Sequence, residues 1–313
     1  MPIRLKASDD PIVKRLRILA KGSPDLKDAA KFYEAVQPIL RDTDLRVASI
    51  SMTPEEARRK MGNGHPLLSD LDLDLDAAAV RELMIELAEA VESVGRRDHP
   101  HRLFWGRVSH EPEAAVRSIR TALVDNRLDI AELLTHISAG ERGPVTAAAQ
   151  DLQLDPDLLW TLAQNALKPA MRAWCRQLTP LAKGASWNRG TCFVCGAAAT
   201  LAELQDNDQA KHLRCGSCGA DWAYQRLQCT YCGNEDQKTL GCLYEKDQGD
   251  KIRVEACHKC KGYLKVISSF TPAPPEMIPV EDLATLHLDY IAQERGYARA
   301  AFSSRSGSRR DGL

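Results

Sequence analysis

Apolar residues recur every three or four positions through the first 180 residues, which is the spacing of one face of an α-helix. Start signals support this pattern. Thr53-Pro54-Glu55-Glu56 has the form of a capping box, and Asp76 precedes a long run rich in Ala, Leu and Glu as a helix cap. We therefore predict an all-helical domain over residues 1–183, with helices near 11–20, 24–40, 53–62, 76–94, 111–124, 129–137, from 143 onward and 155–181.

Beyond Lys183-Gly184-Ala185-Ser186 the apolar spacing changes to every second residue, as in short half-buried strands. A proline-rich link then precedes one helix from about Val280 to Arg299, and the last residues have too few apolar side chains to fold. We expect strands at 200–204, 220–228, 239–245, 251–255 and 263–270, with a hairpin turn at 247–250. The predicted class is α+β, with a helical domain (1–183), two ribbon regions of short antiparallel strands (184–228 and 229–271), a C-terminal helix (272–300) and a disordered tail (301–313).

Four Cys-x-x-Cys pairs give the ribbon region its chemistry, because each pair can place two thiolates on one metal ion. Nineteen residues separate the first pair from the second, and twenty-four separate the third from the fourth. These gaps are typical of paired metal-binding motifs. Read consecutively, the pairs predict two tandem four-cysteine sites, and interleaved pairing, first with third, stays open. The candidate ligands are Cys192, Cys195, Cys215, Cys218, Cys229, Cys232, Cys257 and Cys260.

Glycines follow the pairs at a regular place. Gly196, Gly219 and Gly233 come directly after the second cysteine, where a positive φ lets backbone N–H groups turn toward the sulfurs. In the last pair the glycine stands one residue later, as Gly262. The two halves also resemble a duplication, since the equivalent pairs are offset by 37 and 42 residues.

Other readings of these residues are weaker. A disulfide framework suits small secreted domains, and this chain shows no export signal. A thiol enzyme needs an accessible cysteine free of metal, and only Cys175 and Cys242 are spare; they form no Cys-x-x-Cys, and Cys175 is expected to be a buried small apolar residue. A closed four-sulfur shell is poor at Lewis-acid catalysis, so we do not expect an enzyme. Iron and zinc both accept this ligand set.

Remaining polar residues suggest no further site. His212 and His258 lie near the cysteines, where a supporting role is expected because four sulfurs already fill the shell. The other histidines considered show no metal-ligand spacing, and the alternating aspartates are expected to be a solvated face rather than a cation site. These residues are His65, His99, His101 and His110, and Asp70, Asp72, Asp74 and Asp76.

Composition restricts the partners. The net charge is −1, and the segment from Cys192 to Phe270 carries ten basic and ten acidic residues, whereas a nucleic-acid-binding face normally shows a basic excess. A local patch of Arg214, Arg226, Arg253, Lys259, Lys261 and Lys265 is the alternative. No segment has a signal-peptide or membrane-spanning pattern, so we expect a cytoplasmic protein without membrane insertion.

Several short motifs surround the cysteine pairs and continue into the C-terminal helix. They are Trp187-Asn188-Arg189-Gly190-Thr191-Cys192, Val194-Cys195-Gly196, Leu213-Arg214-Cys215-x-x-Cys218, Trp222, Arg226, Cys229-x-x-Cys232-Gly233, Arg253-Val254-Glu255, Cys257-x-x-Cys260, Tyr263-Leu264-Lys265, Asp282-Leu283-Ala284, Leu288-Asp289 and Gly296-Tyr297. With these motifs the chain resembles the family of formate dehydrogenase accessory proteins, FdhE, most strongly over residues 156–299. Phe193 departs from the proline that this family often has, and it leaves the ligands intact.

The resemblance implies a non-enzymatic cytoplasmic maturation factor that binds the catalytic subunit of respiratory formate dehydrogenase and is needed for its activity. It also implies rubredoxin-like iron sites, with the eight paired cysteines as ligands and zinc as the alternative metal. No nucleic-acid partner is expected, and the oligomeric state stays open. The alternative function is a zinc-ribbon scaffold that binds nucleic acid or another protein.

Overall fold

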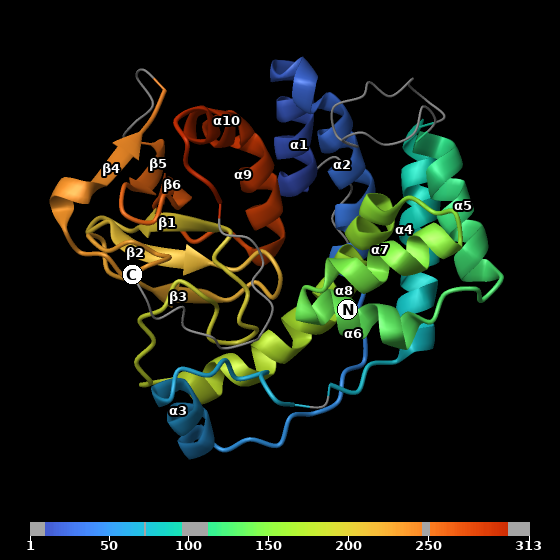
Figure 1. The fold of residues 1–313 in the computed structure, drawn as a ribbon, viewed down its shortest axis with the longest axis horizontal. Helices are drawn as coiled ribbons and strands as arrows, with labels where there is room; N and C mark the ends of the chain where they lie inside the picture. The colour runs from blue at the N-terminus through green and yellow to red at the C-terminus, as the bar shows by residue number, and fades with distance from the viewer. Residues whose placement is uncertain (1–9, 72, 96–111, 246–250, 300–313) are drawn as a thin grey trace.

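The computed structural model of the chain describes residues 10–71, 73–95, 112–245 and 251–299. A helical part and a part built on a six-stranded sheet lie side by side (Figure 1), which confirms the α+β class. Several predicted features lie outside the described residues: the turn at 247–250, the tail at 301–313, Asp72, and His99, His101 and His110.

Two helices of the helical part begin where the sequence signals stand, whereas the predicted start at Pro24 is a 3₁₀ turn and α2 begins at Lys27. Thr53 and Glu56 form the predicted capping box, and Asp76 accepts hydrogen bonds from the backbone N–H groups of Ala78 and Ala79, both at 3.0 Å. These bonds satisfy donors that a first helical turn leaves unpaired. The helices are α1 (Pro11–Gly22), α2 (Lys27–Asp42), α3 (Pro54–Gly62), α4 (Ala77–Gly95), α5 (Pro112–Val124), α6 (Ile130–Ala139), α7 (Arg142–Asp151) and α8 (Pro156–Leu178), with short 3₁₀ turns at Pro24–Leu26 and Thr179–Ala182.

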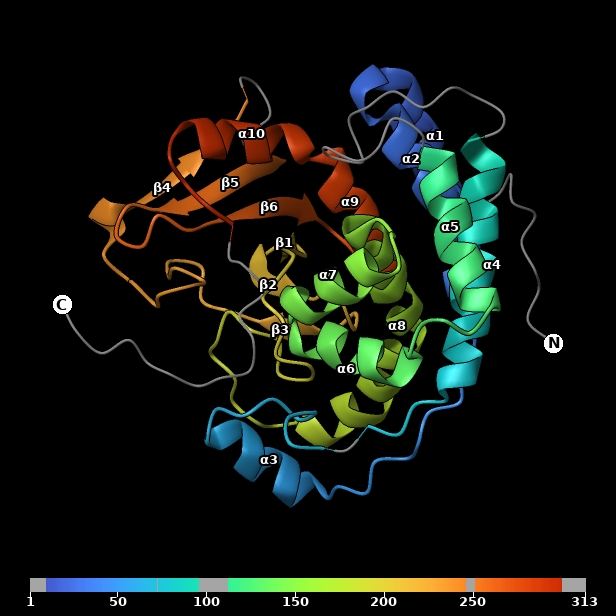
Figure 2. The same ribbon diagram turned by 45° about the vertical axis from the view of Figure 1, so that its right-hand side comes forward.

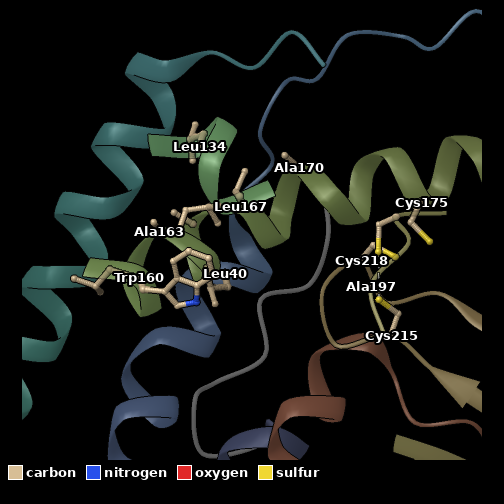
Figure 3. Packing of buried hydrophobic residues seen from close by; sticks show 14 of the residues in the cluster. Leu40, Leu134, Trp160, Ala163, Leu167, Ala170, Cys175, Ala197, Cys215 and Cys218 are labelled. Carbon is tan, nitrogen blue, oxygen red and sulfur yellow. Dashed lines mark hydrogen bonds between the residues drawn. The ribbon is translucent and has the colours of Figure 1, made fainter. Parts of the chain in front are cut away.

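Helix α8 links the two parts of the molecule. It continues through Pro169 and is buried along most of its length. Figure 3 shows Trp160, Ala163 and Leu167 facing the other helices, while Cys175, further along the same helix, points toward the cysteine loops. The hydrophobic core therefore extends without a break from the helices into the first ribbon region.

Six strands form one sheet in the order β3-β2-β1-β6-β5-β4. Neighbouring strands are antiparallel, as predicted, except that β1 and β6 run parallel, with Ala202 opposite Val266. This parallel pair joins the two ribbon regions into one sheet, which sequence spacing alone did not predict. The strands are β1 (Leu201–Gln205), β2 (Ala210–Arg214), β3 (Asp221–Ala223), β4 (Leu240–Leu243), β5 (Ile252–Cys257) and β6 (Tyr263–Ser269), and a 3₁₀ turn, Gln237–Thr239, precedes β4.

Strand β2 was missing from the predicted set because its sequence is mostly polar. Its charged side chains are nevertheless buried, Lys211 at 2% and Arg214 at 2% exposure. The Lys211 ammonium lies 2.6 Å from the Glu255 carboxylate, and Arg214 pairs with Glu203. Paired charges can occupy a buried strand face that apolar periodicity does not reveal.

The predicted single C-terminal helix was wrong: α9 (Ile278–Ala284) and α10 (Leu286–Glu294) are separate, after a 3₁₀ turn at Pro275–Met277. At the break, the Thr285 hydroxyl donates to the Glu281 carbonyl at 2.8 Å, a local bond that competes with regular helix geometry. The break lets α9 pack against α1 and α2 while α10 lies over β4, β5 and β6 (Figure 2). Among the described residues, no helix is both long and apolar enough to span a bilayer.

Candidate metal centres

The eight paired cysteines gather into two groups of four. We call them the first cluster (Cys192, Cys195, Cys215, Cys218) and the second cluster (Cys229, Cys232, Cys257, Cys260). Within each cluster all four sulfurs lie within 4.8 Å of one another. The grouping is consecutive, so among the described residues the interleaved arrangement does not occur.

Each cysteine pair sits in the same backbone loop. The carbonyl of the first cysteine accepts from the N–H four residues on, at 2.9–3.0 Å, and its own N–H donates to the carbonyl five residues on, at 2.7–2.9 Å. In the first three loops the glycine predicted to take positive φ does so: Gly196, Gly219 and Gly233. Four equal loops support the predicted duplication.

The fourth loop corrects one prediction. Positive φ falls on Lys261, at 59°, and not on Gly262. Gly262 is instead required by a close approach, because an added Cβ would overlap the Tyr231 ring. Lysine in this conformation costs about 1–2 kcal/mol relative to glycine. The fourth loop thus keeps the geometry of the other three although a lysine stands at the position with positive φ.

The sulfur geometry fits one tetrahedral ion in each cluster. Cross-pair Sγ–Sγ distances are 3.5 Å for Cys192–Cys218 and Cys195–Cys215, and 3.6 and 3.8 Å for Cys229–Cys260 and Cys232–Cys257. A metal with sulfur ligands at about 2.3 Å separates them by roughly 3.8 Å. Backbone N–H groups of Val194 and Gly262 approach the sulfurs of Cys192 and Cys260 at 3.4 Å, which stabilises thiolates. Each group of four can therefore hold one ion.

The first cluster is part of the protein core. Its cysteines are 0%, 8%, 0% and 1% exposed, in chain order. The loop before α4 packs against the loop that carries Cys192 and Cys195. There the N–H groups of Leu67 and Leu68 donate to the carbonyls of Phe193 and Val194 at 2.7 and 2.9 Å. Phe193 itself packs edge-on against Trp222, with ring centroids 6.4 Å apart.

Helix α8 adds two residues to the wall of the first cluster. Cys175 is buried, as predicted, and its sulfur lies 3.6 Å from the Thr179 hydroxyl, while Figure 3 shows it directed toward Cys218. Arg172 is also buried and lies 3.2 Å from Glu276. Burial lowers the pKa of Arg172, with Glu276 and the Cys218 thiol acting in the opposite direction. Sequence reasoning missed Arg172, since nothing in a helical pattern marks a cation that faces sulfur.

The second cluster lies at the surface. Cys229 and Cys257 are buried, whereas Cys232 and Cys260 are exposed. The Tyr224 hydroxyl donates to the Cys229 carbonyl at 3.1 Å, and the Asn234 amide lies 3.8 Å from the Cys257 sulfur. A cavity of about 340 Å³ opens beside this cluster, and Leu227, at 61% exposure, stands at its wall.

The loops hold one sulfur of each cluster ready to ionise. Hydrogen bonds from Cys192, Cys195 and Cys218 place the pKa of Cys215 well below its ordinary value, while burial raises the pKa of Cys192. Burial opposes ionisation of Cys257, but N–H groups of Cys260 and Lys259 outweigh it and bring its pKa to about 7. Thiolate is the form that binds metal, so both clusters are prepared for it.

The other candidate residues lie elsewhere. His212 pairs with Asp221, and His258 accepts or donates a 2.7 Å bond with the Tyr297 hydroxyl, so both have supporting roles. Cys242 is exposed on β4, outside both clusters. Asp76 caps α4, and Asp70 stands in a positive-φ turn. Among the described residues, no group of metal-binding type other than the two clusters was found.

The basic patch, which sequence analysis kept as an alternative, does not form as one surface. Arg214 and Lys265 are buried, at 2% and 1% exposure. Lys265 lies 2.6 Å from Asp289, and Arg253 lies 3.1 Å from Glu255. Three of the six basic residues are therefore paired with carboxylates, two of them inside the protein, so the six do not form one free surface for phosphate groups.

Comparison with known proteins gives consistent matches. The family described as "FdhE, C-terminal domain" matches residues 227–304. The chain is 33% identical over 118 residues to a protein FdhE homolog of Aquifex aeolicus, covering 36% of this chain and 40% of that protein. It is 31% identical over 187 residues to the homolog of Stutzerimonas stutzeri, covering 58% and 60%. The aligned region thus spans about half the length of these relatives.

A solved structure extends the likeness to the whole fold. The FdhE protein from Pseudomonas aeruginosa matches with a TM-score of 0.58 and 23% identity over 95% of both chains. At that identity the likeness shows a shared fold. Residues 227–304 thus match the C-terminal domain of the FdhE family, and the chain as a whole is similar in fold to an FdhE protein.

Proposed function

We propose that this protein is a cytoplasmic maturation factor that binds the catalytic subunit of formate dehydrogenase and is needed for its activity, without being an enzyme itself. The observation that carries the proposal is the pair of four-cysteine clusters within an FdhE-type fold. The family name links the relatives to formate dehydrogenase, and the client and its dependence on this chain are our inference.

The eight clustered cysteines would each donate one thiolate, four to each of two iron ions, with zinc as the alternative metal. Iron held by four sulfurs supplies one-electron transfer, and either metal cross-links the loops. A closed shell leaves no open position for substrate. The protein's own contribution is the loop geometry, which sets the four sulfurs in place before metal arrives.

The second cluster is the better candidate for contact with the client. Two of its cysteines are exposed, and Leu227, two residues before Cys229, presents its side chain to solvent. A single exposed leucine is common on protein surfaces, so the inference depends on the two exposed cysteines, with Leu227 as an apolar contact beside them. The first cluster is enclosed by the helical part and offers little surface to a partner.

A pull-down tests this proposal. The tagged chain would be expressed in its native host, grown with and without formate, next to Cys257→Ser and the matched control Cys242→Ser. We expect the catalytic subunit of formate dehydrogenase with the wild type and with Cys242→Ser, and its loss with Cys257→Ser. Recovery of nucleic acid or of unrelated proteins in its place would overturn the proposal and favour the zinc-ribbon scaffold.

A further inference from the structure

A second cavity, of about 430 Å³, lies between the helical part and the first cluster. Its walls come from α6, α8, α9 and the loops around Cys195 and Gly216. Part of the lining is apolar, including Ile137, Leu167 and Met171, and part offers hydrogen bonds through Ser138, Gln164 and Ser217. This mixture is typical of a site for a small organic molecule.

One cation of this cavity has no ion-pair partner. Asp282 and Arg299 line the cavity together, and they form an ion pair with each other at 2.5 Å. Lys265 also contacts Asp282, at 2.7 Å. Lys168 has a different environment: its ammonium donates to the neutral Asn165 side chain at 2.9 Å. Among the described residues, Lys168 has no carboxylate within ion-pair distance, so a ligand in the cavity could supply one.

Lys168 is half-buried, and its surroundings disfavour the charged form of its amine. Burial, and then the nearby Arg172 guanidinium, lower the pKa of Lys168 to about 8, and Asp282 offsets only part of this effect. The amine retains donors beyond the one given to Asn165. A negative group in the cavity would stabilise the ammonium form and use those donors.

We propose that this cavity binds a small organic anion, with its carboxylate or phosphate group paired to Lys168 and its apolar body against Leu167 and Met171. Cys195, the most exposed sulfur of the first cluster, lies in the same cavity. A bound anion would therefore cover the side on which the first cluster approaches solvent. This inference does not depend on the identity of the client protein.

Calorimetric titration of the full chain tests the site with two anionic probes, hexanoate and inorganic phosphate, and with neutral hexanol. We expect one of the two anions to bind the wild type. Its affinity should fall at least tenfold in Lys168→Met and recover in part in Lys168→Arg. Lys183→Met, at an exposed lysine on the same chain segment, is the matched control and should bind as the wild type does. Hexanoate binding would identify a carboxylate site, and phosphate binding a phosphate site.

Binding must also occur in this cavity. With ¹³C-methyl-labelled methionine, the anion should shift the Met171 signal, assigned through Met171→Leu, and leave the other methionines in place. The proposal is overturned if neither anion binds at millimolar concentration, if Lys168→Met binds as well as the wild type, if hexanol binds as well as hexanoate, or if Met171 does not respond.

Discussion

The two cysteine clusters share one loop geometry and differ in everything around it. The first cluster lies inside the hydrophobic core, with three of its four cysteines at 1% exposure or less. The second has two exposed cysteines and borders a cavity at the surface. A duplicated unit can keep its metal geometry while its copies take different tasks. We infer that the first cluster fixes the fold, whereas the second faces the partner.

The largest expected difference between the clusters is the loss of protein stability when one cysteine ligand is replaced in each. Cys215→Ser removes a sulfur from the core, and loss of that metal should cost at least about 4 kcal/mol, or roughly 8–16 °C in melting temperature. Cys257→Ser should lower the melting temperature by less than half as much as Cys215→Ser does. Thermal unfolding followed by circular dichroism measures both. Equal losses would contradict the assignment of the structural role to the first cluster.

Metal release should separate the clusters by rate. A chelator reaches two exposed sulfurs of the second cluster directly, whereas in the first cluster only Cys195 borders a cavity and the other three sulfurs become accessible only after part of the core opens, so we expect two phases that differ by at least about tenfold. A chromogenic chelator records both phases. The fast phase should vanish in Cys257→Ser. A single phase that includes both metals would show that burial does not distinguish the sites.

A charge at the surface beside the second cluster should weaken client capture. Burying one leucine at an interface contributes about 1.5–3 kcal/mol, so Leu227→Glu should reduce recovered client about tenfold or more. Val124→Glu, on α5, is a matched control because its side chain is 59% exposed, close to the 61% of Leu227. Co-purified client is quantified by mass spectrometry. If both variants reduce client recovery equally, or if Leu227→Glu does not reduce it, the surface beside the second cluster does not bind the client.

The smallest expected effect concerns the fourth loop. Lys261→Gly relieves the positive-φ conformation but loses a contact of its ammonium with the Tyr297 ring at 5.6 Å, so we expect a net gain of roughly 0.5 kcal/mol. Gly233→Lys makes the reverse change at the equivalent position and should destabilise by about 1 kcal/mol or more. Urea unfolding compares the two variants. A stabilising Gly233→Lys would contradict the equivalence of the loops.

Local features of the fold were predictable from sequence, and long-range ones were not. The capping signals of Thr53 and Asp76 placed helix starts, because each acts within three residues. The spacing of the cysteines and the glycines at Gly196 and Gly233 indicated the loops. The parallel pairing of β1 with β6 joins residues more than 60 positions apart, and apolar periodicity holds no information on such partners.

The surroundings of the clusters escaped prediction for a related reason. Arg172 and Cys175 come to the first cluster from α8, whose sequence shows only helical spacing. Their role depends on how the helix docks, which is a property of packing between distant segments. Lys261 was missed because the loop geometry overrides residue preference there. The ligand role of the eight cysteines stays a prediction until metal is measured.

Metal stoichiometry by native mass spectrometry tests the central claim most directly, because it counts ions and identifies iron or zinc by mass. We predict two ions in the wild type and one in the double variant Cys229→Ser/Cys257→Ser, whose changes both fall in the second cluster. Interleaved pairing would place one change in each site and leave no intact site. A wild type without metal, or a double variant that keeps two ions or none, would contradict the account of two independent four-cysteine centres.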